Sequence, residues 1–335
     1  MLATDLVPAA MVAAAVAPAL LVLWLIVAAD SRPEPPKVVL IGVILGALST
    51  AAAAVLELLL QQVLPFSSNR WVAAYETALW VASIPEETLK VGIIAAIALH
   101  SREFDEPMDG IVYGSAVGLG FAALENLLYV IGAGAGWGTI AAVRGVLSVP
   151  FHGALGAIAG SYIVRARFTG VLGAHKDDHW RRRRLFVLAW FVPVVLHSIF
   201  DAALFAARGT PAEEADKTEG MVGILLTLSV AAVVGFGAII FAAVLARRIA
   251  RRQKMWLETK RLPPVHWRDV WAECLIGIGL SFIALMLVIA GGPAMKLAGC
   301  GLMVLALGTA WHCGKSLNEA AKARHPAVAA ASAAS

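Results

Sequence analysis

The chain has 335 residues, of which 60% are hydrophobic and only 15% are charged, and its mean hydropathy is +0.79. Soluble globular domains are closer to half apolar and a quarter charged, so this composition excludes an ordinary soluble protein. The net charge of +4 is no argument for a nucleic-acid partner, because the basic residues cluster in a few loops. The three cysteines lie in the last apolar region without a CxxC pair, which gives no support to a disulfide framework or a zinc finger.

Apolar runs recur along the chain, and each run of about 20 residues is long enough to cross the ~30 Å hydrocarbon layer of a bilayer. A spanning segment must satisfy its own backbone polar groups, and alternation with a period of two is absent, so we predict an all-α fold. The protein is therefore expected to be a polytopic transmembrane helical bundle. The nine predicted spans are 6–29, 38–60, 78–99, 109–131, 140–163, 185–207, 221–245, 272–291 and 294–313.

Loops on one side of these spans hold 21 Lys and Arg residues, whereas loops on the other side hold 5. Because Lys and Arg accumulate in cytoplasmic loops, we predict that the N-terminus is outside and the C-terminus is in the cytoplasm. The spans also suggest a division of the chain into four parts. These are an N-terminal hairpin at 1–74, a four-helix core at 75–207, a three-span region at 208–313 and a disordered tail at 314–335.

Four consecutive predicted spans, from the third to the sixth, carry ionisable or strongly polar side chains. Such groups cost a few kcal/mol each in hydrocarbon, so they are candidates for function. At a rise of ~1.5 Å per residue, the acidic groups and histidines fall in the outer half of the membrane or near its midplane. Because a charge facing lipid would be penalised, we predict that they meet in one cluster. Its members are Glu86, Glu87 and Lys90, then Glu125 and Asn126, then His152, then His197 and Asp201.

Helical spacing favours contact between these side chains. Glu86 and Lys90 are four residues apart, as are His197 and Asp201, so each pair lies on one helix face. Glycines recur every four residues in the fourth span and after His152 in the fifth, and such small-residue faces let helix backbones approach closely. These glycines are Gly110, Gly114, Gly118, Gly156 and Gly160.

The segment SIPE predicts a local break in the third span. Ser83 followed by Glu86 fits a capping box, and Pro85 is tolerated in the first turn of a helix. We therefore predict that the helix stops near Ile84 and restarts, which places Glu86 and Glu87 at a helix N-terminus inside the membrane. The helix dipole favours negative charge there, and a broken helix is permitted where it lines a wet cavity.

This set of side chains suits hydrolysis of an amide bond by water. Two close carboxylates do not both ionise easily, so one of Glu86 and Glu87 keeps a proton, which suits a general base. Lys90 offsets the remaining charge, and Asp201 can fix the tautomer of His197. A histidine or an asparagine side chain can stabilise a developing oxyanion.

The same groups offer a second reading, in which they hold a divalent metal such as Zn²⁺. Two histidines and a carboxylate form a common catalytic zinc shell, and here the candidates are His152, His197 and Glu125. The HExxH motif does not occur, and the histidines come from separate helices, so spacing alone does not identify a metal site. Asn126 is the candidate oxyanion donor.

Two other classes of function are alternatives to an enzyme. Ionisable groups in spans also mark proton-coupled transporters, which often have inverted repeats, but here the polar motifs are confined to spans three to six. A non-catalytic membrane scaffold would use the same groups as structural hydrogen bonds and ion pairs, with His152 as a satisfied core histidine. Glu57, near the end of the second span, is interpreted as an interfacial or structural carboxylate.

The motifs resemble a known family. PEETLK resembles the EExxK motif of the PrsW-like intramembrane proteases, and residues 104–130 resemble their second conserved block, with FxxxEN at Phe121, Glu125 and Asn126. FHGALGAIAG and LHSIFD fit the later histidine motifs of that family. The resemblance covers residues 75–206, so the four-helix core is expected to be the protease part of the chain.

The resemblance implies an intramembrane protease, similar in plan to the CAAX prenyl endopeptidases of the Abi superfamily. It implies a membrane-anchored protein substrate, in some cases an anti-sigma factor cleaved at its outer side, and a location in the bacterial inner membrane. Both metal-dependent and metal-free glutamate mechanisms are argued for such proteins. The implied catalytic residues are Glu86, Glu87, Glu125, His152 and His197, with Lys90, Asn126, Asp201 and Phe121 in support.

Overall fold

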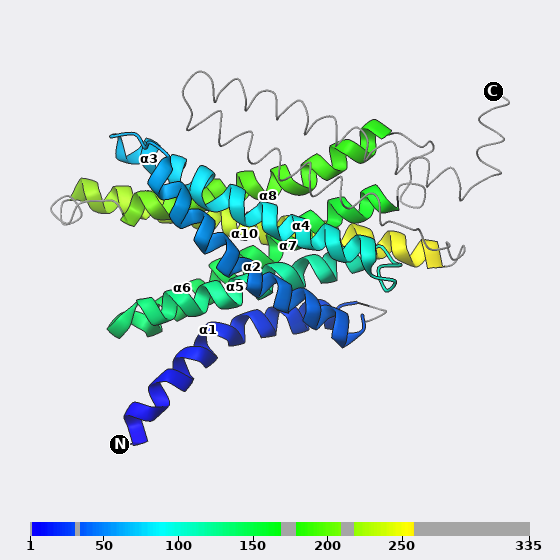
Figure 1. Cartoon of the computed structure of the whole chain (residues 1–335), viewed down its shortest axis with the longest axis horizontal. Helices are drawn as coiled ribbons and strands as arrows, with labels where there is room; N and C mark the ends of the chain where they lie inside the picture. Colours follow the sequence, from blue (N-terminus) through cyan, green and yellow to red (C-terminus); the bar gives the residue numbers. More distant parts are fainter. Residues whose placement is uncertain (1, 31–33, 169–178, 209–217, 258–335) are drawn as a thin grey trace.

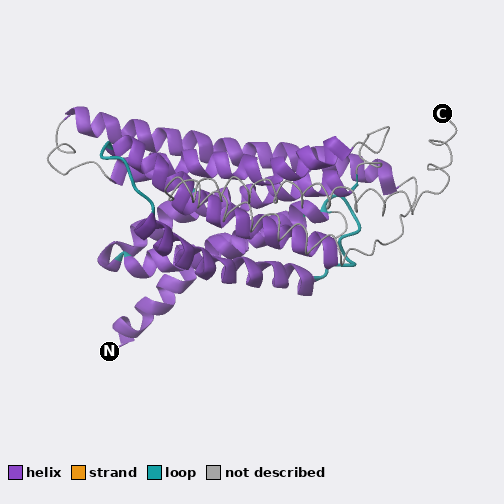
Figure 2. Ribbon diagram, turned by 45° about the horizontal axis from the view of Figure 1, so that its top comes forward, coloured by secondary structure: helices purple, strands orange, loops and turns teal. Residues whose placement is uncertain are grey.

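The computed structural model describes residues 2–30, 34–168, 179–208 and 218–257, which form a bundle of long helices (Figure 1). These ranges contain no strand, and Figure 2 shows the helices running along a common axis. The all-α prediction is confirmed. The long helices are α1 (Leu2–Ala28), α2 (Pro36–Val63), α5 (Asp109–Gly132), α7 (Ser148–Arg167), α8 (His179–Arg208) and α10 (Thr218–Leu257).

Six helical stretches in the described residues are long and apolar enough to cross a membrane, as expected for an integral membrane protein. They overlap six of the nine predicted spans. The predicted third span lies in a continuous helical stretch of α3 (Arg70–Glu76), the π-helix η1 (Thr77–Ser83) and α4 (Ile84–His100). The last two predicted spans and the predicted tail lie outside the described residues.

The predicted fifth span consists of two helices. A short 3₁₀ turn η2 (Gly134–Gly136) leads into α6 (Trp137–Val146), and α7 begins one residue after Leu147. Leu147 departs from ideal helical geometry, with φ −106° and ψ −60°. α6 and α7 together therefore span the range predicted as one helix.

The predicted break at SIPE is wrong. Ser83 is helical, with φ −63° and ψ −42°, and its side chain makes no capping hydrogen bond. The helix instead widens into π-helical turns, in which the N–H of Ile84 bonds to the carbonyl of Leu79. Pro85 cannot donate a hydrogen bond, and its ring would clash with the carbonyl four residues earlier, so a wider turn accommodates it without a break.

Helix α5 lies at the centre of the bundle and packs against α7 over most of its length. A Cβ atom added at Gly114 would overlap the carbonyl oxygen of Gly156, and the same holds for Gly110 against Gly160 and Gly118 against His152. The pairing runs in opposite directions along the two helices, so they are antiparallel. The prediction that the glycine faces permit close backbone approach is confirmed.

Helix α2 packs on another side of α5 and runs parallel to it. A Cβ atom added at Gly46 would overlap the carbonyl oxygen of Val117, and the Thr50 hydroxyl donates to the carbonyl of Phe121 at 3.1 Å. These contacts fix the register between the two helices.

A cluster of buried polar side chains, which we call the acidic anchor, holds the N-terminal end of α5. Its members are Glu34 before α2, Glu106, Asp109 and Tyr113 at the start of α5, and Gln253 of α10. The Tyr113 hydroxyl donates to Glu34, the N–H of Glu106 donates to Asp109 at 2.6 Å, and Gln253 donates to Glu106 at 2.5 Å.

Candidate active site

The centre of the site is the ammonium group of Lys90 on α4, a residue that is completely buried. Its Nζ atom lies 2.7 Å from Glu87 Oε1, 3.0 Å from Glu86 Oε2 and 3.1 Å from His152 Nδ1. The ring of Phe121 covers Nζ at 3.9 Å from the ring centroid. Because the ammonium donates to His152 Nδ1, the proton of that neutral ring belongs on Nε2.

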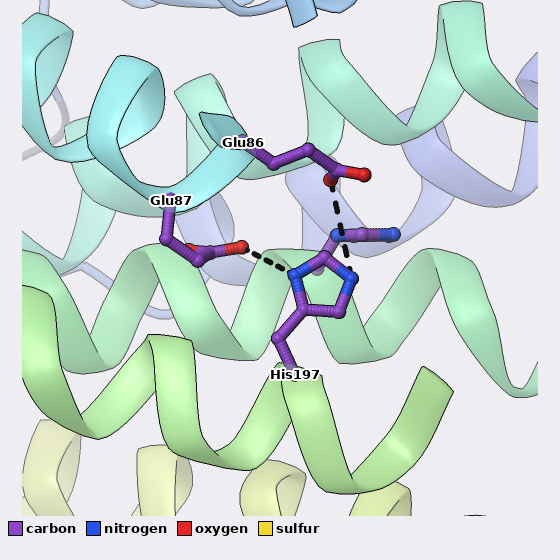
Figure 3. A group of neighbouring side chains, drawn as sticks. Glu86, Glu87 and His197 are labelled. Carbon is purple, nitrogen blue, oxygen red and sulfur yellow. Dashed lines mark hydrogen bonds and ion pairs between the residues drawn. The ribbon is translucent and has the colours of Figure 1, made fainter. Parts of the chain in front are cut away.

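His197 on α8 faces carboxylates through both ring nitrogens. Figure 3 shows Glu86 and Glu87 reaching from α4 toward this ring. Nδ1 lies 2.9 Å from Glu87 Oε1, whereas Nε2 lies 3.2 Å from Asp201 Oδ2 and 3.9 Å from Glu86 Oε2. The Trp190 indole N–H donates to the Thr88 hydroxyl at 2.9 Å, which holds α8 against α4 near these contacts. The predicted contact between Asp201 and His197 is present, and it places Asp201 where it can orient the ring.

His152 is held from behind by a chain of polar contacts. Its Nε2 lies 3.0 Å from Glu125 Oε2, and Glu125 pairs with Arg144 of α6 at 2.7 Å. Arg144 also donates to the side-chain oxygen of Asn126 at 3.2 Å, and the Asn126 amide donates to the carbonyl of Ala15 in α1 at 2.8 Å. A carboxylate that accepts the second N–H of a histidine fixes the orientation of its ring.

The predicted role of Asn126 as an oxyanion donor does not fit these contacts. Both ends of its amide are engaged, one with Arg144 and one with α1, and the residue is completely buried. The structure favours the alternative reading for this residue, a structural hydrogen-bond network that joins α5, α6 and α1.

The structure brings together all five predicted catalytic residues. The charged side chains deepest in the site, Glu86, Glu87 and Lys90, are almost fully buried. Side chains of Glu86 and Glu87 are 6% and 1% exposed, whereas Glu125 and Asp201 are 17% and 16% exposed. Four carboxylates thus face two permanent cations, Lys90 and Arg144. Buried charges need compensation, so this imbalance favours uptake of protons or of a further cation.

A divalent metal is one cation that these residues suit. Donor atoms of Glu86, Glu87, His152 and His197 all lie within 4.8 Å of one another. Histidine nitrogen and carboxylate oxygen are ordinary ligands of zinc, so the donor set fits. The Lys90 ammonium contacts three of these four side chains, so a metal would bind in its place. The set differs from the one expected from the sequence, because Glu125 stands behind His152 and two glutamates of α4 take its place.

Two side chains near the site were not recognised from the sequence. Arg144 was not among the predicted site residues, but it is 9% exposed and pairs with Glu125. A basic residue at the apolar edge of a predicted span was the signal that could have identified it.

The second is Glu57, which was interpreted as an interfacial or structural carboxylate. It is half-buried on the face of α2 that carries Thr50 and Ala53, toward α5. It lies within electrostatic range of Glu125, His197 and Lys90. Glu57 follows Thr50 by seven residues, or about two helical turns, so both lie on the same helix face. This spacing was the only signal in the sequence.

Comparison with known proteins gives one family. Residues 34–236 match the family described as PrsW family intramembrane metalloprotease, a range that extends beyond 75–206 to include α2 and the start of α10. The protein called Protease PrsW from Bacillus subtilis (strain 168) is 42% identical over 121 residues, which are 36% of this chain and 50% of that protein.

Protease PrsW from Oceanobacillus iheyensis is 31% identical over 191 residues, 57% of this chain and 81% of that protein. Protease PrsW from Clostridioides difficile (strain 630) is 32% identical over 125 residues, 37% of this chain and 50% of that protein. The matched part therefore spans about half the length of several curated relatives. No solved structure gives a significant match.

Proposed function

Because the chain belongs to the PrsW family of intramembrane metalloproteases, we propose that it is an endopeptidase that hydrolyses a peptide bond of a membrane-anchored protein. The observation that carries this proposal is the convergence of Glu86, Glu87, His152 and His197 on one buried point, with the Lys90 ammonium among them. A structural ion pair needs only one carboxylate and one cation, whereas here two carboxylates and two histidines surround one ammonium group.

Glu86 is the better candidate for the general base. Glu87 Oε1 accepts from both Lys90 and His197 Nδ1, so it is committed to orienting them. The contacts of Glu86 with described residues use Oε2, which leaves Oε1 to take a proton from a water molecule. The side chain of Glu86 is also the more exposed of the two.

The reaction proceeds by ordinary acid–base steps. Glu86 takes a proton as the water oxygen attacks the carbonyl carbon, and the positive charge of the buried Lys90 ammonium stabilises the developing oxyanion. Glu86 then returns the proton to the leaving nitrogen as the C–N bond breaks. His152 and Glu125 position Lys90 through the contact at Nδ1.

In the metal-dependent form, Glu86, Glu87, His152 and His197 would hold a divalent metal such as Zn²⁺, which when bound supplies a Lewis acid that polarises the carbonyl and activates water. The remaining residues keep their tasks: Asp201 orients His197, and Glu125 orients His152.

The substrate class we propose is a protein with one membrane span, such as an anti-sigma factor, cleaved near the outer side of a bacterial inner membrane. The positive-inside rule supports an N-terminus outside and the active site in the outer half of the bilayer. We also propose that residues 75–207 form the protease core, flanked by the N-terminal hairpin and the C-terminal spans.

The experiment is cleavage of a tagged single-span anti-sigma factor by the purified full-length protein in vesicles. We expect kcat to fall roughly 100-fold or more in Glu86→Gln, because general-base catalysis is lost, with KM little changed. Glu103→Gln, at an exposed position outside the site, is the matched control. Equal cleavage by wild type and Glu86→Gln would point to a scaffold or a transporter instead.

Treatment with a strong chelator separates the two forms of the mechanism. Loss of cleavage that added zinc restores supports the metal-dependent form. Unchanged cleavage supports a metal-free mechanism carried by Glu86.

A further inference from the structure

A cavity of about 410 Å³ opens between the ends of α7, α8 and α10. Arg165 on its wall lies 13 residues beyond His152 on α7, roughly 20 Å along the helix, so the cavity is separate from the candidate active site. Five arginines line it, contributed by three helices: Arg165, Arg181, Arg248, Arg251 and Arg252.

Arg165 is the lining arginine that is most affected by the positive charges around this cavity. Arg165 is half-buried in the last turn of α7, beside the ring of Tyr162. Arg248, Arg252 and Arg181 all oppose its positive charge. Like charges that converge on a concave, partly desolvated site raise the free energy of the protein, and an anion bound among them relieves that cost.

The floor of the cavity is apolar. Leu185 of α8 and Ile249 of α10 line it together with the arginines, and Ile249 is only 1% exposed. A ring of guanidinium groups around an apolar floor fits a ligand that has an anionic group beside hydrocarbon. A small inorganic anion would leave the apolar floor unused.

The position of the cavity in the bundle agrees with such a ligand. The basic segments Arg181–Arg184 and Arg247–Arg252 flank it, at the start of α8 and near the end of α10, on the side of the bundle that holds most of the Lys and Arg residues outside the predicted spans. The positive-inside rule assigns this end to the cytoplasmic leaflet, whose headgroup layer is anionic. Arginine binds phosphate oxygens with two parallel hydrogen bonds, which suits it to this layer.

We propose that this cavity binds the phosphate headgroup of an anionic phospholipid from the cytoplasmic leaflet, with the arginines on the phosphate and the lipid chains beside Leu185 and Ile249. The lipid bridges α7 and α8, which carry His152 and His197, to α10. Binding to the folded bundle stabilises it by mass action, so the lipid would hold these helices together at the end remote from the active site.

The test uses purified full-length protein in phosphatidylcholine nanodiscs, with phosphatidylglycerol titrated in. Native mass spectrometry counts the retained lipid, and the thermal unfolding midpoint reports stabilisation. We expect retention of phosphatidylglycerol and an upward shift of the midpoint. The double variant Arg165→Gln/Arg248→Gln should bind phosphatidylglycerol roughly thirtyfold more weakly. The control Lys37→Gln/Arg102→Gln removes the same charge from exposed positions away from the cavity and should bind as wild type does.

Each contrary outcome overturns the proposal. Equal weakening in the two double variants would mean that general surface charge attracts the lipid. If phosphatidylcholine were retained as well as phosphatidylglycerol, the cavity would not distinguish an anionic headgroup from a zwitterionic one. Stabilisation by inorganic pyrophosphate without retention of lipid would assign the cavity to a soluble anion. Because the double variant includes the half-buried Arg165, the single change Arg248→Glu at an exposed position provides a second variant that keeps the fold.

Discussion

The two ends of α5 both bury carboxylates, but they neutralise them differently. At the C-terminal end, Glu125 faces Arg144 and His152, and the neighbouring Glu86 and Glu87 face Lys90. At the N-terminal end, in the acidic anchor, Glu34 accepts from the Tyr113 hydroxyl, and Asp109 accepts from the backbone N–H of Glu106.

The difference teaches how burial relates to chemistry. The carboxyl groups of the acidic anchor accept hydrogen bonds from neutral donors, which are the Tyr113 hydroxyl, the Glu106 backbone N–H and the Gln253 amide. The candidate active site instead keeps charge, with cations placed beside carboxylates and histidines between them. Charged groups that remain close in a buried site are the ones that can move protons in a reaction.

The largest expected effect is that of removing the central cation. Lys90→Met leaves Glu86 and Glu87 buried without their partner, which should lower the free energy of unfolding by about 3–5 kcal/mol. Cleavage should become undetectable. Thermal unfolding in detergent and the vesicle cleavage assay measure both effects. Lys37→Met, at an exposed position, should change neither quantity, and a stable, active Lys90→Met protein would contradict the central place given to this ammonium.

The second prediction concerns the approach of α5 to α7. A methyl group at position 156 would overlap the carbonyl oxygen of Gly114, so Gly156→Ala should cost about 1–3 kcal/mol of stability and lower cleavage by displacing His152. At Gly138 in α6 an added Cβ meets nothing within 4 Å. Gly138→Ala should therefore be neutral or stabilising, since alanine favours helix. If both variants behaved alike, the close packing at the glycine face would be irrelevant to the site.

The third prediction concerns a positioning residue. Arg144→Gln removes the charge that holds Glu125 behind His152, so we expect kcat to fall roughly tenfold with KM nearly constant. Arg144→Lys should restore much of the loss, because it restores the charge. A matched change, Arg102→Gln in an exposed loop, should leave kcat unaltered. A fall in stability alone, without rescue by lysine, would reduce Arg144 to a packing role.

The smallest expected effect lies at the acidic anchor. Burial raises the pKa of Glu34 above its ordinary value of 4.5. A carboxyl with a raised pKa in the folded state contributes stability below about pH 4.5, and this contribution is lost as the pH rises through the folded-state pKa. Glu34→Gln lacks this loss, so its unfolding midpoint relative to wild type should rise with pH above 4.5, by a few degrees. Cleavage should not change.

Thermal scans from pH 5 to pH 8 check this prediction. Glu103→Gln, in the exposed loop before α5, should show no such trend. A midpoint difference that stays constant with pH would mean that Glu34 does not titrate differently in the folded state.

Contacts within one helix were predictable, and contacts between helices were predictable only in part. The pairs Glu86–Lys90 and His197–Asp201 follow from helical spacing, and both are present. The glycine faces predicted that two helices approach closely. The sequence did not indicate that Lys90 would reach His152, or that Arg144 would neutralise Glu125, because those distances depend on how helices are rotated against each other.

The errors have local physical causes. A proline next to a serine and a glutamate fits a helix start, but a π-helical turn accommodates the same proline without a break. Asn126 was expected to face the reaction, yet it fills its hydrogen bonds with α1 and Arg144. The interpretation of Glu57 as an interfacial or structural carboxylate stays a prediction, because nothing on its own helix distinguishes a lipid-facing carboxylate from one that faces α5.

The sequence by itself determined that this protein lies in a membrane and which ionisable side chains its spans carry. Hydropathy sets which segments prefer hydrocarbon, and helical spacing sets which neighbours share a face, since both depend only on local composition and geometry. Only the tertiary structure decided which side chain neutralises which. That choice depends on helix rotation and register, which the backbone contacts at Gly46, Gly114 and Gly156 fix across segments far apart in the chain.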